Sequence, residues 1–223
     1  MRIKLKALGL GLLAAAAVSA VTAMNAGATE GGHFTTDLTH VDLHGFNGFG
    51  HNLHFVQHGV AGEVGCAEPT HEATMISATK TVSELTVTPK YKECYTTGGG
   101  KPGSVIIDVN GCTYIFKVAK NTTDTTEQTA RLECPGGAVM KITHPNCTTT
   151  IHPQNVNTGI TYKKVVGPPH HITIDSDAQF TITSHGLCQF ILPTVGAGTL
   201  KGSVRIKAIN PNKKTEELNI TAT

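Results

Sequence analysis

The sequence contains no tryptophan, few aromatic residues and few charged ones. Of its 223 residues, 5% are aromatic and 15% are charged, whereas Gly, Thr and Val are frequent. These frequent residues favour short strands joined by turns. Apolar and polar residues alternate with period two along much of the chain, and helical periodicity is missing after the N-terminal segment. The sequence therefore predicts an all-β protein.

Only one long apolar run is present, and it lies at the N-terminus. Residues 7–23 carry no charge, follow three basic residues and precede Ala26 and Ala28. A basic start, an apolar segment and a small-x-small site together indicate a secretory signal peptide. We expect residues 1–28 to be this signal peptide. The mature chain is then secreted, extracellular or in the cell envelope, and has no transmembrane segment.

The mature chain also lacks an excess of charge of either sign. Three of the 18 Lys and Arg residues lie in the expected signal peptide, which leaves 15 cations against 16 Asp and Glu residues. A nucleic-acid partner would require a basic surface. We therefore expect no such partner.

No C-x-x-C pair is present, which argues against a structural zinc site built on cysteines. All six cysteines lie in the mature chain, and an even number in an exported protein predicts three disulfides. The predicted bridges are Cys66–Cys94, Cys112–Cys134 and Cys147–Cys188. Only the second is supported by strand register, and other pairings of the remaining four cysteines stay open.

Residues 105–134 give the most detailed prediction of strand register. Asn110-Gly111 is a strong hairpin signal, because both residues of a tight turn take positive φ. A second turn near residue 123 completes a three-stranded meander with one apolar face. The predicted pairs are Ile107 with Tyr114 across the first turn, and Tyr114 with Leu132, Phe116 with Ala130, Val118 with Gln128 and Cys112 with Cys134 across the second.

A second hairpin is predicted around Gly186, pairing Phe180 with Phe190 and Ile182 with Cys188. Further strands are expected at 38–44, 52–58, 83–89, 138–143, 148–152, 160–165, 172–175 and 200–208. More than ten short strands predict an antiparallel β-sandwich or two packed β subdomains. The secreted β domain is expected to span residues 29–210, with a subdomain seam near 153–159 and a polar C-terminal tail at 211–223.

Four segments resemble signatures of a family of uncharacterised secreted β proteins found in many copies in some soil actinobacteria. They are LTVTPKYKEC at 85–94, VNGCTYIF at 109–116, ECPGG at 133–137 and CTTTIHPQ at 147–154. The shared motifs consist of turn glycines, cysteines and core aromatic residues. The resemblance therefore implies a disulfide-containing β fold and carries no activity with it.

Histidine is the one compositional anomaly, with six of the twelve within 26 residues. Strand alternation places His40, Asp42 and His44 on one face, and His54 and His58 on one face of the next strand. If these two strands pair, all five side chains share a face. Imidazoles and a carboxylate are ligands for Zn²⁺ or Cu²⁺. The alternative is a solvated histidine-rich surface without metal.

Local enzyme motifs are incomplete. Ser77 and Lys80 match S-x-x-K without its companion elements, and His71-Glu72 lacks the second histidine of a zincin. The leading expectation is an exported, non-enzymatic protein that acts by surface binding or as an envelope component, with a cell-surface or protein ligand. The first alternative is an extracytoplasmic Zn/Cu-binding protein that uses the N-terminal histidines. The second is a hydrolase whose residues assemble only in space.

Overall fold

The computed structural model describes residues 32–46, 54–57, 63–67, 70–96, 100–101, 103–118, 126–156, 159–165, 167–187 and 195–222. The expected signal peptide, residues 1–28, lies outside these ranges. Within them, every element except the short 3-10 turn Pro135–Gly137 is a β-strand, and all pairings between strands are antiparallel. The all-β prediction is confirmed.

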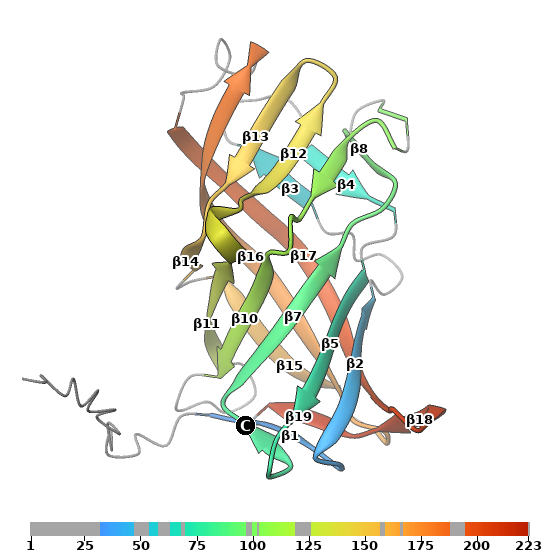
Figure 1. The fold of residues 1–223 in the computed structure, drawn as a ribbon. Coiled ribbons are helices and arrows are strands. Elements are labelled where there is room, and N and C mark those ends of the chain that lie inside the picture. Colours follow the sequence, from blue (N-terminus) through green and yellow to red (C-terminus); the bar gives the residue numbers. More distant parts are fainter. Residues whose placement is uncertain are drawn as a thin grey trace, which may run out of the picture.

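Eight strands form a closed ring in the lower half of the molecule (Figure 1), called here the lower ring. Each strand pairs with the next, and the last pairs with the first. In order around the ring they are β17 (Val195–Asn210), β2 (His40–Phe46), β5 (Thr70–Ile76), β7 (Glu84–Lys90), β10 (Thr113–Val118), β11 (Thr126–Glu133), β15 (Ile160–Val165) and β16 (His171–Gly186).

A second ring, the upper ring, shares β16 and β17 with the first. Its other strands are β3 (His54–Gln57), β4 (Glu63–Cys66), β8 (Cys94–Thr96), β9 (Ile106–Asp108), β12 (Met140–His144) and β13 (Cys147–Ile151). An isolated bridge between Cys94 and Val105 joins β8 to the start of β9 and closes this ring.

The shared strands β16 and β17 hold the two rings together. Each has 16 residues, which corresponds to a length of about 50 Å. They pair without interruption from Ile172 with Ile206 to Thr183 with Val195. Away from the strand ends their even-numbered residues face the interior, among them the buried Ile174, Phe180 and Val204. One continuous apolar core therefore fills both rings.

The rings correct the predicted architecture. The sheet curls and closes on itself, so the predicted β-sandwich is not confirmed. The segment around the expected seam, 153–159, contains β14 (Gln154–Val156), which pairs with β11. The predicted tail carries β18 (Lys213–Leu218), which pairs with β17, and β19 (Ile220–Ala222).

A small three-stranded sheet covers the lower end of the lower ring (Figure 1). It consists of β19, β1 (Phe34–Thr36) and β6 (Thr81–Val82). Phe34 and Ile220 in this sheet are completely buried. We call it the lower cap.

The turn at Asn110-Gly111 forms as predicted, but its hairpin does not. Asn110 and Gly111 have φ of 48° and 76°. Beyond the turn the strands separate, because β9 joins the upper ring and β10 the lower. Ile107 pairs with Ile142, and Tyr114 with Val87, so the predicted pairing of Ile107 with Tyr114 is wrong. Across the second turn, the predicted register of β10 with β11 is confirmed.

The hairpin predicted around Gly186 is also wrong. Gly186 has the expected positive φ of 70°, but β16 continues as one strand to that residue. Phe180 pairs with Gly198, and Ile182 with Gly196. The predicted partners Phe190 and Cys188 lie outside the described residues.

Two predicted disulfides are confirmed, Cys66–Cys94 and Cys112–Cys134. Cys147 is also disulfide-bonded. Because its predicted partner Cys188 lies outside the described residues, the pairing of Cys147 stays a prediction.

Candidate functional site

The predicted metal-binding residues of β2 alternate as expected. Val41 and Leu43 are buried in the core. His40 and His44 are exposed and Asp42 is half-buried on the opposite face. Across the neighbouring strand β5, Asp42 accepts a hydrogen bond of 3.3 Å from the Thr74 hydroxyl.

A shared face for all five residues required this strand to pair with the next one, and in the structure these two strands do not pair with each other. The strands β2 and β3 both pair with β17, but at different positions along it. His44 of β2 lies opposite Lys207, and His54 of β3 lies opposite Lys201. Six residues along a strand correspond to about 20 Å, so the two histidines cannot share one metal ion. His58 lies outside the described residues. Among the residues that the structure describes, no three His, Cys, Asp or Glu side chains come together as a metal site.

The interior of the lower ring contains a cavity of about 40 Å³. It lies among inward-facing side chains of β7, β10, β11, β15, β16 and β17, and these are nearly all apolar. The wall consists of Val87, Tyr114, Phe116, Ala130, Ile160, Ile174, Ser176, Ala178, Phe180, Leu200, Val204 and Ile206.

Small side chains leave this space open. Ser176 and Ala178 interrupt the large inward residues of β16, and Ala130 does the same on β11. The residue paired with Ser176 is Gly202, which adds no side chain to fill the gap. The Ser176 hydroxyl donates to the carbonyl oxygen of Leu200 at 3.0 Å. The wall therefore offers a ligand apolar contact and few unused hydrogen-bonding groups.

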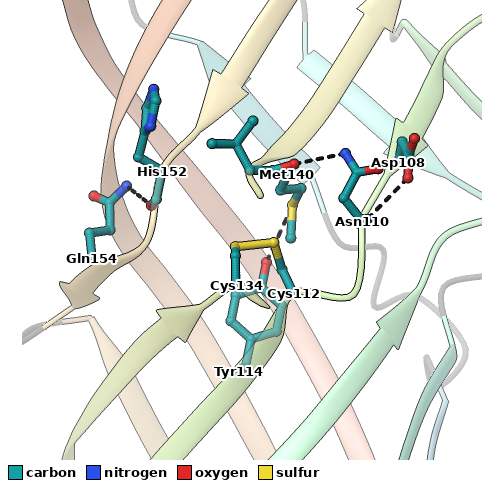
Figure 2. Close-up of a disulfide and its surroundings, with 9 residues drawn as sticks. Asp108, Asn110, Cys112, Tyr114, Cys134, Met140, His152 and Gln154 are labelled. Carbon is teal, nitrogen blue, oxygen red and sulfur yellow. Dashed lines mark hydrogen bonds between the residues drawn. A yellow bond between two sulfur atoms is a disulfide. The ribbon is translucent and has the colours of Figure 1, made fainter. Parts of the chain in front are cut away.

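Tyr114 closes the cavity on the side of the upper ring. Its hydroxyl lies 3.3 Å from the Tyr91 hydroxyl and donates to the Met140 sulfur at 3.9 Å. Burial raises the pKa of Tyr114 to about 12, so this phenol is neutral at physiological pH. Figure 2 shows Tyr114 beneath the Cys112–Cys134 disulfide, with Met140 beyond it.

The same disulfide fastens two places where the chain passes between the rings (Figure 2). Cys112 precedes β10, and Cys134 follows β11. The Asn110 side-chain amide donates to the Val139 carbonyl oxygen at 2.8 Å and joins the same two crossings. The upper boundary of the cavity is thus a rigid, cross-linked corner.

An aromatic column separates the cavity from the lower cap. The rings of Phe116 and Tyr162 are 6.2 Å apart, and those of Tyr162 and Phe34 are 5.4 Å apart. Phe116 lines the cavity, whereas Phe34 belongs to the cap. The Tyr162 hydroxyl is buried without a hydrogen-bond partner among the described residues.

A polar cluster lies on the outer face of the lower ring, near the cap. His171 is 5% exposed. Arg205 Nη2 lies 3.0 Å from its Nδ1, and Glu217 Oε2 lies 3.3 Å from its Nε2. Lys207 Nζ forms a short ion pair with the other oxygen of Glu217. Burial, and then the Arg205 charge, lower the pKa of His171.

Comparisons with family models, with curated proteins and with solved structures find no match to this chain. The resemblance to secreted actinobacterial proteins therefore stays a prediction. No helix in the described part of the chain is long and apolar enough to cross a membrane. The disulfides fit an extracellular protein.

Sequence reasoning missed the cavity. The available signal was the pair of small residues Ser176 and Ala178 at inward positions of a strand that otherwise carries Ile and Phe. This signal shows where one strand leaves space in the interior. Whether neighbouring strands fill that space depends on pairings that the sequence did not reveal.

Proposed function

We propose that the protein is an exported, non-enzymatic binding protein, and that the cavity of the lower ring holds a small apolar molecule. This proposal rests on the cavity wall, whose twelve residues are mostly aliphatic or aromatic and lie inside a closed ring of eight strands. A closed sheet of eight strands is just wide enough for its own side chains or for one small ligand. Here small residues leave part of that width unfilled.

The volume and the wall indicate the class of ligand. About 40 Å³ exceeds the roughly 10–15 Å³ that one water molecule needs, but a water also needs two to four polar partners. It is below the roughly 150 Å³ of a cavity that accepts benzene. A short hydrocarbon chain suits this apolar space better than a planar ring or a charged molecule.

Straight-chain primary alcohols from ethanol to octanol provide a graded test. Each methylene buried adds about 0.8 kcal/mol, so affinity should rise about fourfold per carbon and stop rising when the cavity is full. Binding to the folded state raises the melting temperature. The rise in melting temperature at equal alcohol concentration is therefore the readout.

Matched variants separate the cavity from general solvent effects. Ala178→Leu fills the cavity, and Ala178→Val is the milder version if the larger side chain overpacks the core. Gln179→Leu adds the same side chain at the next, exposed position. Chain-length dependence should persist in Gln179→Leu and disappear in the Ala178 variants. If the native protein shows no such dependence, or all variants show it equally, the proposal is wrong.

His44 and His54 lie at different heights on β17. The metal-binding and hydrolase alternatives therefore gain no supporting observation from the described residues.

A further inference from the structure

The lower cap is held by the C-terminal segment. In β19, the Ile220 amide donates to the His170 carbonyl oxygen at 2.9 Å, and the His170 amide donates to Asn219 Oδ1 at 2.8 Å. The Asn219 amide in turn donates to Asp37 Oδ2 at 2.8 Å. β19 also pairs with β1, which places Ala222 opposite Phe34. Lifting residues 213–222 would therefore uncover the aromatic column below the cavity.

The hydrogen bonds of His171 favour its neutral imidazole. Arginine only donates hydrogen bonds, so Nδ1 of His171 accepts from Arg205. The ring hydrogen is then on Nε2 and is donated to Glu217. A second proton on Nδ1 would point directly at the Arg205 guanidinium, and the existing hydrogen bond would be lost.

The charges around His171 oppose its protonation. Arg205 and Lys207 on β17 are cationic, and among the described residues Glu217 on β18 is the one carboxylate beside His171, already paired with Lys207. On its other side, β15 presents the uncharged Val165 as the register partner of His171. Immediately before β16, His170 is bonded to the C-terminal segment through both its backbone amide and its carbonyl oxygen. A protonated His171 is better solvated when β18 lifts away, because β18 supplies the group that covers its Nε2.

We infer that residues 213–222, which carry β18 and the lower-cap strand β19, form an acid-released segment at the lower end of the lower ring, and that His171 is its latch. The latch holds at neutral pH, where a neutral imidazole satisfies both Arg205 and Glu217. In mild acid the protonated form favours the open state, in which β18 and β19 separate from the ring. That this opening releases a ligand rests on the proposed function, whereas the latch itself does not.

Amide hydrogen exchange of the ligand-free protein tests the latch. With an unfolded histidine pKa near 6.5, opening at pH 5.5 becomes easier than at pH 7.5 by up to about tenfold, after correction for intrinsic rates. The loss of protection should appear at Leu218 and Ile220 and be absent at Thr149 in the upper ring. Equal loss at both ends, or no loss at the cap, would overturn the inference.

Variants assign the effect to one side chain. Gln mimics neutral His with one acceptor and one donor, so His171→Gln should abolish the pH dependence of cap exchange. His185→Gln, at an exposed position in the upper ring, should leave it unchanged. Glu217→Gln provides a second test, because loss of the carboxylate should loosen the cap already at pH 7.5. A His171→Gln protein whose cap still loosens in acid would contradict the latch.

The link to the cavity has its own readout. NMR exchange of bound 1-butanol should show a release rate that rises by the same factor as cap opening, in the native protein and not in His171→Gln. A cap that opens without faster release would overturn its role as a gate. If no alcohol binds at all, the proposed function and the gate both fail, while the exchange data still decide the latch.

Discussion

Removal of the Cys112–Cys134 disulfide should destabilise the protein substantially. The bridge closes a loop with a sequence separation of 22 residues. In the chain-entropy model, such a loop corresponds to about 3.4 kcal/mol at 25 °C. Small domains have unfolding free energies of about 5–15 kcal/mol, so this one bridge represents a large share. The double variant Cys112→Ala/Cys134→Ala removes it without leaving a free thiol.

Urea unfolding of the variant and the native protein, each extrapolated linearly to zero denaturant, measures this difference in unfolding free energy. The matched variant is Cys66→Ala/Cys94→Ala, whose bridge spans 28 residues and corresponds to about 3.6 kcal/mol. Both should lower the midpoint by similar amounts, since the stabilisation depends only weakly on loop length. A loss below about 1 kcal/mol for either variant would refute the entropic reasoning.

Two further predictions concern stability. Burial lowers the pKa of both His144 and His171, so the stability that depends on their neutral imidazoles is present above pH 6.5 and is lost as the pH falls through their folded-state pKa values. The melting temperature of His144→Gln/His171→Gln should therefore decline less than that of the native protein between pH 7.5 and 5.5. An equal decline in the two proteins would contradict this prediction. Tyr162→Phe removes a buried hydroxyl without a described partner, so it should be neutral or stabilise by about 1 kcal/mol in urea unfolding, whereas a loss of that size would indicate a bonded hydroxyl.

Local patterns in the sequence predicted local structure well. The register of β10 with β11 followed from one turn and one alternating apolar face, and the Cys112–Cys134 bridge followed from that register. Val41 and Leu43 were correctly placed inside for the same reason. In these cases the partner residues lie close in sequence, so few alternatives competed.

The prediction of which strands pair was wrong where the alternation of apolar and polar residues was the only guide. Alternation says which face of a strand is buried, but Ile107 fits Tyr114 and Ile142 equally well by this criterion. The structure selects Ile142 because β9 and β10 belong to different rings. Likewise, β2 and β3 both pair with a strand about 150 residues away in the sequence. The cavity depends on all these distant pairings at once and could not be predicted.

Methyl NMR during titration with 1-butanol tests the central claim most directly, because it reports where the molecule binds. The wall contributes the methyl groups of Ile160, Ile174, Leu200, Val204 and Ile206. These resonances should shift together and saturate, whereas those of the buried upper-ring residues Ile107, Ile142 and Ile151 should not move. Saturable shifts confined to the upper ring or the outer surface, or no saturable shift at all, would contradict a ligand site in the lower ring.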